Sequence, residues 1–95
     1  MKMADKVLDN TAQSRYEMPL PAGTAFIDYT VAGNVRTLTH AEVPLALRGA
    51  GIAARLTGGA LDLVRSQGIK VIPRCPYVVN FMNAHPQYQD LLAGR

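Results

Sequence analysis

The stretch EVPLALRGAGIA at residues 42–53 decides the fold of this chain. Its first residues read as a strand that bulges, and two glycines then lead directly into a helix-forming segment. Gly49 and Gly51 allow positive φ angles and a close approach of the backbone to a ligand, which a Cβ would block. The first N–H groups of the helix have no intrahelical partner, so they point at the loop with the positive end of the helix dipole. The loop is therefore predicted to bind a phosphate or pyrophosphate, with Arg48 as a fixed cation.

Two common phosphate-binding motifs do not explain this loop. Residues 49–54, GAGIAA, satisfy the loose dinucleotide fingerprint, but Pro44 and Arg48 interrupt the approach, and residues 70–75 contain no acidic residue for a ribose. A Rossmann domain would also need a longer chain. The P-loop of nucleoside triphosphatases is excluded because no Gly-Lys-Ser/Thr triplet occurs. What remains is the pattern R-x-x-G-x-A, which is formed by Arg48, Gly51 and Ala53.

Length and composition predict one domain over residues 1–95 with a single modest core. Apolar residues make up 48% of the chain, which argues against disorder, and no apolar run is long enough for a membrane span or a signal peptide. One cysteine excludes an internal disulfide and suits a reducing cytosol, so a cytoplasmic location is expected. The net charge is +3, but the ten Lys and Arg residues are scattered, so neither a nucleic acid nor a membrane is an expected partner.

The hydrophobic pattern changes period once along the chain. Alternation predicts four strands first, and helical spacing follows, with Gly68 as a stop signal. The predicted elements are strands at 6–10, 15–18, 25–31 and 35–43, a helix at 52–67, a strand at 70–73, a helix at 77–84 and a last turn at 89–93, with a connecting turn at 19–23. The fold class is therefore α/β (α+β), in the order β-β-β-β-α-β-α, with a mixed and mainly antiparallel sheet. The strand–helix–strand step should be parallel.

Two local features of these elements carry structural expectations. On the strand at 35–43, strict alternation places Val35, Thr37, Thr39, Ala41 and Val43 on one face, and Arg36, Leu38, His40 and Glu42 on the other. In the middle of the long helix, Gly58 and Gly59 each cost about 1 kcal/mol relative to alanine. Close packing of the helix against the sheet is expected to compensate for that cost.

Cys75 and Glu42 are the candidate catalytic side chains. Cys75 precedes Pro76, which is favoured at the first helical position, so Cys75 should cap the second helix, where the dipole and Arg74 favour the thiolate. Such a cysteine could act as a nucleophile, or it could be a small buried apolar residue. Glu42 could take a proton from an ammonium substrate, or it could form a surface ion pair. His40, on the same face, could orient Glu42, act as a base itself or simply face solvent.

The loop pattern, with a strand before it and a helix after it, resembles the coenzyme A loop of the GNAT acyltransferases. Further segments occur in a matching order: NT at 10–11, RYE at 15–17, AFIDY at 25–29, HAEVP at 40–44, RGAGIA at 48–53, PRCPY at 73–77 and HPQY at 85–88. In these segments the chain resembles the minimal single-domain GNAT-like family that includes small plant and vertebrate proteins called N-acetyltransferase domain-containing. The resemblance covers nearly the whole chain, from about residue 10 to residue 92.

The resemblance implies a sheet that splays between its fourth and fifth strands, with the pantetheine arm of acetyl-CoA in the split. Free backbone groups at Val43 and Leu45 would then pair with the pantetheine amides. The resemblance also implies that acetyl-CoA, with no metal, is held by a set of nine residues: Val43, Leu45, Arg48, Gly49, Ala50, Gly51, Ile52, Ala53 and Asn80. Cys75 stands at the family's active-site position.

One departure from the wider GNAT pattern concerns the tyrosine that protonates the departing thiolate. That place falls on Met82, which cannot donate a proton, so either Tyr77 or Cys75 takes another role or catalysis is weak. The resemblance predicts an acetyl-CoA-binding N-acetyltransferase in which an amine attacks the thioester directly, with Cys75 near the sulfur and Glu42 as base. The alternatives are a non-catalytic coenzyme A-binding or interaction module and transfer through an acetyl-Cys75 intermediate. The amine acceptor and the oligomeric state stay open.

Overall fold

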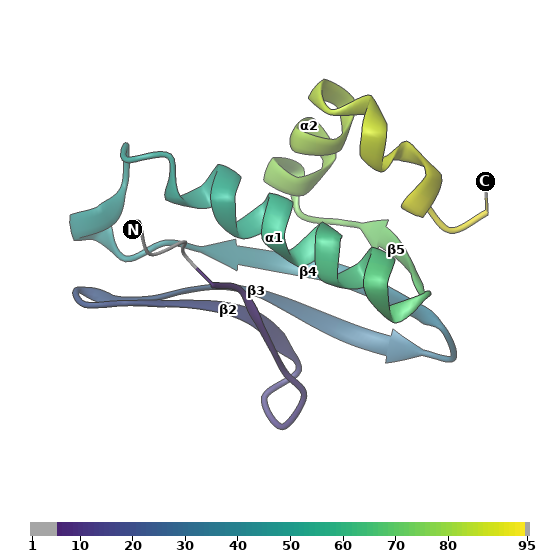
Figure 1. Cartoon of the computed structure of the whole chain (residues 1–95), viewed down its shortest axis with the longest axis horizontal. Coiled ribbons are helices and arrows are strands. Elements are labelled where there is room, and N and C mark those ends of the chain that lie inside the picture. The colour runs from purple at the N-terminus through teal and green to yellow at the C-terminus, as the bar shows by residue number, and fades with distance from the viewer. Residues whose placement is uncertain (1–5, 95) are drawn as a thin grey trace.

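The computed structural model of the chain describes residues 6–94. The elements are β1 (Leu8–Asn10), β2 (Arg15–Leu20), β3 (Gly23–Ala32), β4 (Val35–Glu42), the 3₁₀ helix η1 (Leu45–Leu47), α1 (Ile52–Gln67), β5 (Lys70–Pro73), α2 (Pro76–Ala84) and the 3₁₀ helix η2 (Pro86–Leu91). One sheet has the order β1-β2-β3-β4-β5, antiparallel except for the parallel pair β4–β5. Both α-helices lie on the same side of the sheet (Figure 1). This architecture confirms the predicted fold class.

A single apolar core lies between the sheet and α1. Alternate residues of the strands supply the sheet side, since successive side chains of a strand point to opposite faces. Fully buried side chains of the sheet are those of Tyr16, Met18, Ala25, Ile27, Leu38 and Val71, and those of α1 are Leu56, Thr57, Ala60, Leu61 and Val64. In the part of the chain that the structure describes, no helix is both long and apolar enough to cross a membrane.

A β-bulge in β4 reverses the side-chain alternation that the sequence suggests. Asp28 pairs with His40 and Tyr29 pairs with Leu38, so Thr39 is left between two paired residues. Its Oγ1 donates a hydrogen bond to the Asp28 carbonyl at 3.3 Å. Because the bulge adds one residue, Leu38 and Ala41 both pack on the core side. The prediction that they lie on opposite faces is wrong, since a periodic pattern cannot reveal an inserted residue.

Several element bounds differ from the predicted ones. β1 is shorter and begins at Leu8, β4 ends at Glu42, and the last turn forms earlier, as η2. β2 runs on to Leu20 and includes Pro19, which was expected in a turn. Pro19 pairs with Thr24 but lies beyond the part of β2 that pairs with β1. At such an edge position a missing N–H removes no ladder bond, which is where a sheet tolerates proline.

β4 and β5 diverge halfway along β4, as the predicted splay requires. Their parallel pairing runs from Val35–Lys70 to Leu38–Pro73. The Leu38 carbonyl then accepts hydrogen bonds from the amides of Arg74 at 2.9 Å and Cys75 at 3.1 Å, and the chain turns away into α2. The remaining residues of β4, 39–42, have a strand partner only in β3. After Leu38, the edge of β4 that faces β5 therefore has no strand partner, and we call it the opened edge of β4.

The two glycines in the middle of α1 pack closely, but against different neighbours. A Cβ on Gly59 would collide with Val7, just before β1. A Cβ on Gly58 would lie 3.7 Å from the Phe81 ring and 3.8 Å from the Tyr88 hydroxyl oxygen, which is ordinary van der Waals contact with α2 and η2. The predicted close packing against the sheet is therefore found at Gly59, next to β1, whereas Gly58 faces α2 and η2.

A partly buried polar cluster joins β1 to the rest of the fold. We call it the Asp9 cluster: Asp9, Tyr16, Tyr29, Arg36 and Gln67. The Asp9 carboxylate accepts hydrogen bonds from Tyr29 at 2.6 Å, Arg36 at 2.6 Å and Gln67 at 2.8 Å. Burial alone would raise the pKa of Asp9, but these hydrogen bonds and the Arg36 charge hold it below the ordinary value of 3.8. Burial, as the largest cause, raises the pKa of both tyrosines to about 12.

Candidate active site

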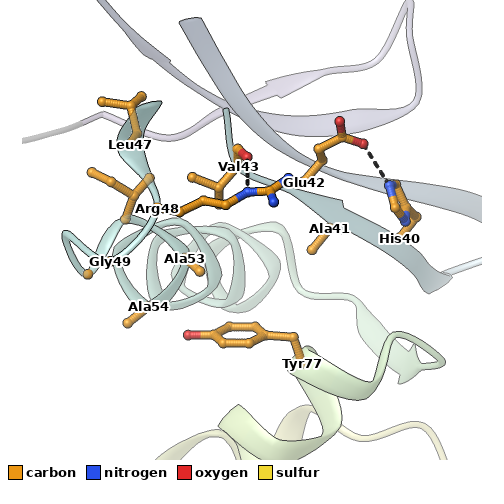
Figure 2. A pocket seen from close by; sticks show the side chains of 12 residues that line it. His40, Ala41, Glu42, Val43, Leu47, Arg48, Gly49, Ala53, Ala54 and Tyr77 are labelled. Carbon is orange, nitrogen blue, oxygen red and sulfur yellow. Dashed lines mark hydrogen bonds and ion pairs between the residues drawn. The ribbon is translucent and has the colours of Figure 1, made fainter. Parts of the chain in front are cut away.

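A cavity of about 500 Å³ lies along the opened edge of β4 and reaches the start of α1 (Figure 2). Residues from both faces of β4 line it, because the cavity wraps the strand edge. The lining residues are His40, Ala41, Glu42, Val43, Leu47, Arg48, Gly49, Gly51, Ile52, Ala53, Ala54 and Tyr77. Most of the predicted binding set, together with Glu42, therefore lies around one cavity.

The glycine loop at the end of the cavity has the geometry that its sequence predicts. Gly49 has φ 87° and Gly51 has φ 75°, and Gly51 is the N-cap of α1. A Cβ at either position would meet no atom within 4 Å, so open space lies over this backbone. The amide of Arg55 donates the bond to the Gly51 carbonyl at 3.2 Å, and the amides before it belong to the open first turn. The loop thus fits an anionic group such as a pyrophosphate.

The segment between β4 and the loop is more compact than expected. Residues 45–47 form η1, closed by hydrogen bonds from the Leu47 amide to the Pro44 carbonyl at 2.8 Å and from the Arg48 amide to the Leu45 carbonyl at 3.2 Å. Leu45 therefore does not extend the strand, its carbonyl already has a partner, and its side chain is 78% exposed. Val43, by contrast, lines the cavity directly after the end of β4.

Arg48 folds back across the segment that precedes it. Its Nε donates a hydrogen bond to the Val43 carbonyl at 3.1 Å, drawn as a dashed line in Figure 2. The Arg48 side chain is exposed and lines the cavity, as Val43 does. The cation predicted for a phosphate is therefore bonded, in this structure, to a neutral backbone acceptor.

Glu42 and His40 form a side-chain pair at the cavity wall. His40 Nε2 lies 3.0 Å from Glu42 Oε1, and both side chains are exposed (Figure 2). Two positions apart on one strand, they share a face, as predicted. The His40 ring also lies 6.4 Å, centroid to centroid, from the ring of Phe26, whose face carries the Arg15 guanidinium at 4.3 Å. The pair thus places a carboxylate and an imidazole where a bound substrate would reach them.

Cys75 lies at the point where the strands diverge, but its side chain is packed inside. It is the N-cap of α2, with Pro76 at the first helical position, as predicted. Its side chain makes no capping hydrogen bond, and the residue is 8% exposed and belongs to the apolar core. The structure does not bring Cys75 into the cavity lining.

Several cavity residues were not in the predicted binding and catalytic sets, and of these Tyr77 carries a hydroxyl group that can act chemically. It lies in the first turn of α2, 39% exposed, with its ring extended below Ala53 and Ala54 at the start of α1 (Figure 2). Burial raises the pKa of its hydroxyl. Met82, at the tyrosine position of the wider GNAT pattern, is buried. The sequence does show a tyrosine two residues after the expected helix cap, which was a local signal for a functional hydroxyl. The direction of the Tyr77 side chain, however, depends on how α2 packs against β4.

Two other predicted residues lie outside the lining. Asn80 is exposed on α2, and Ala50 is exposed between the two loop glycines; like Leu45, neither lines the cavity. Among residues 6–94, no group of three His, Cys, Asp or Glu side chains could hold a metal ion.

Comparison with known proteins places this geometry in a family. The family model described as GCN5-related N-acetyl-transferase matches residues 15–91. Protein NATD1 of Danio rerio is 43% identical over 55 residues, or 56% of this chain and 50% of that protein. Protein NATD1 of Homo sapiens is 39% identical over 64 residues, or 65% of this chain and 57% of that protein. The chain thus spans between half and three fifths of the length of these curated relatives.

A solved structure shares the fold over nearly the whole chain. It is the NMR solution structure of a GCN5-like protein from Staphylococcus aureus, with a TM-score of 0.64 and 19% sequence identity, covering 98% of this chain and 93% of that chain. At this identity the likeness concerns the fold alone, and it agrees with the mixed sheet and its diverging strands. The family model, which covers most of the sequence, shows that the chain belongs to the GCN5-related N-acetyltransferase family.

Proposed function

We propose that this protein binds acetyl-CoA and transfers its acetyl group to an amine. The observation that carries the proposal is the continuity of the site: the opened edge of β4 leads, within one cavity, to the glycine loop at the start of α1. The edge offers backbone groups to an amide-containing chain, and the loop offers amides to a diphosphate. Coenzyme A has these two parts in this order.

In the proposed complex, the residues of the loop hold the pyrophosphate. Amides of residues 49–53 and the Arg48 guanidinium would bind its oxygens, and the Val43 backbone would pair with the pantetheine arm. Of the other predicted contacts, Leu45 and Asn80 have weaker support, because neither lines the cavity. In this orientation the thioester of acetyl-CoA would lie in the part of the cavity that His40, Glu42 and Tyr77 line.

For the chemical step, we propose direct transfer. Glu42, oriented by His40, takes a proton from the ammonium form of the acceptor, and the amine nitrogen then forms a bond to the acetyl carbon. As the carbon–sulfur bond breaks, the thiolate takes up a proton, and Tyr77 is the candidate donor because it lines the cavity. The nitrogen loses its second proton as it becomes an amide, and that proton restores the Tyr77 hydroxyl through solvent. The products are an N-acetylated amine and free coenzyme A.

Transfer through acetyl-Cys75 is the second enzymatic candidate. In its favour, the Cys75 amide is hydrogen-bonded to the Leu38 carbonyl at the divergence of the strands. The thiol would have to leave the core to react, however, since the residue is almost completely buried. Direct transfer needs no such movement, and we favour it for this reason.

Two measurements test the proposal. In a nuclear magnetic resonance titration of the whole chain with acetyl-CoA, the amides of Gly49, Gly51 and Ile52 should shift most; unchanged signals would contradict binding at the loop. Thiol release is then followed with a polyamine, a lysine-containing peptide and an arylamine as probes. If acetyl-CoA binds but none of these amines causes release of the coenzyme A thiol, the result would favour the alternative, a non-catalytic coenzyme A-binding module.

A further inference from the structure

The hydrogen bond from Arg48 Nε to the Val43 carbonyl joins the two halves of the proposed coenzyme A site. One partner is the cation expected at the pyrophosphate, and the other is the backbone acceptor expected at the pantetheine arm. Both residues line the cavity. The Arg48 amide donates a hydrogen bond to the Leu45 carbonyl, and the chain turns at Gly49. These two features fix the Arg48 backbone, so its side chain reaches back to Val43 from a defined position.

The two possible partners of Arg48 differ in strength. A backbone carbonyl is a neutral acceptor, whereas a phosphate is an anion that the guanidinium fork matches with charge-assisted bonds. When a ligand carries a pyrophosphate, Arg48 can exchange the weaker partner for the stronger one and release the Val43 carbonyl. When a ligand has no phosphate, its amide must displace the guanidinium from the Val43 carbonyl, and Arg48 gains only water in exchange, which costs affinity.

From this geometry we propose that Arg48 makes the site select complete coenzyme A thioesters against phosphate-free ones. In the free protein the guanidinium is bonded to the Val43 carbonyl, the acceptor proposed for the pantetheine arm, and only a phosphate offers it a stronger partner. The inference rests on the proposed function, because it assumes that the cavity binds coenzyme A. It adds a specificity role that a simple phosphate contact does not have, since Arg48 then opposes the binding of short thioesters.

The test compares coenzyme A with pantetheine, which lacks the nucleotide and its phosphates, by isothermal titration calorimetry. In Arg48→Ala, the dissociation constant for coenzyme A should rise about tenfold or more, because a charged phosphate contact is lost. For pantetheine it should fall about two- to tenfold, because one competing hydrogen bond is gone. Lys6→Ala removes an exposed cation that does not line the cavity and should change neither value beyond about twofold.

A second readout follows the side chain itself. Inorganic pyrophosphate added to the wild-type chain should move the Arg48 Nε–H resonance toward that of a charge-assisted hydrogen bond, whereas saturating pantetheine should move it toward that of a solvent-exposed guanidinium. If Arg48→Ala weakens coenzyme A but leaves pantetheine unchanged or weaker, Arg48 is only a phosphate ligand, and the selectivity role is overturned while the proposed function stands. If the wild-type chain binds no coenzyme A, the proposed function itself fails.

Discussion

His40 Nε2 and Glu42 Oε1 lie 3.0 Å apart at the edge of β4 that β5 leaves open. The contact fixes the direction of a carboxylate that would otherwise rotate freely on an exposed strand. It also ties the candidate base to a ring whose own position is set by Phe26 on the neighbouring strand.

The first prediction concerns this pair. Glu42→Gln keeps the size and hydrogen-bonding capacity of the side chain but cannot take a proton, so acetyl transfer should fall by about 100-fold or more. His40→Gln should cause a smaller loss, since it affects only the orientation of Glu42. Thiol-release rates with the responding amine measure both effects, and calorimetry should show unchanged coenzyme A affinity. A Glu42→Gln protein with the wild-type rate would remove Glu42 from the proposed mechanism.

The second prediction uses two glycines with similar backbone angles. Gly51 has φ 75° and Gly33 has φ 62°, and a Cβ on either would meet open space. Valine at each position should therefore cost a similar backbone strain, about 1–3 kcal/mol of unfolding free energy. Only Gly51→Val fills the space over the loop, so only this variant should lose coenzyme A binding, by about tenfold or more. Thermal unfolding and calorimetry separate the two effects; equal losses of affinity would point to strain alone.

The third prediction concerns Cys75. Because the residue is buried and outside the cavity lining, iodoacetamide should label it slowly in the native chain and quickly after unfolding. Cys75→Ala should lower the unfolding free energy by about 1 kcal/mol and leave coenzyme A affinity and acetyl transfer nearly unchanged. The opposite result, loss of transfer with intact binding, together with an acetyl group on Cys75 by mass spectrometry, would establish the covalent route.

The fourth prediction concerns acid stability. The native pKa of Asp9 lies below its ordinary value of 3.8, so the folded state favours the carboxylate. The resulting stabilisation is complete well above that ordinary value and is lost as the pH falls through the native pKa, which lies below 3.8. Asp9→Asn should remove this part of the pH dependence and lower the unfolding free energy at neutral pH by about 1–3 kcal/mol.

Urea unfolding at several pH values tests this expectation. Asp28→Asn, in β3 on the face opposite the Asp9 cluster, is the matched control and should keep the acid dependence of the wild type. If Asp9→Asn loses stability in parallel with the wild type as the pH falls below 3.8, the Asp9 cluster is not the source of the acid sensitivity.

Sequence reasoning succeeded where the structure depends on neighbours along the chain. The positive φ angles at Gly49 and Gly51, the cap at Cys75 and the shared face of His40 and Glu42 all follow from residue type and local spacing. Prediction from the sequence failed where the local structure depends on packing or pairing with another element. The bulge at Thr39 depends on the pairing with β3.

The same limit explains the residues that the site prediction missed or misplaced. Tyr77 reaches the cavity because α2 leaves the sheet at the Leu38 carbonyl, which no pattern within 76–84 encodes. The bond from Arg48 to Val43 depends on η1, whose three residues were expected to be extended.

The short length of β1 has a consequence for association between chains. β1 has only three residues and pairs with β2 alone, so backbone pairing holds it weakly, and the Asp9 cluster supplies much of its attachment. If β1 detached, residues 15–17 of β2 would lose their pairing with it, and the edge of the sheet would move to β2. The amides and carbonyls that β1 now covers would then be open to pairing with a strand of another chain. We therefore expect the bonds around the Asp9 carboxylate to oppose such pairing as well as unfolding.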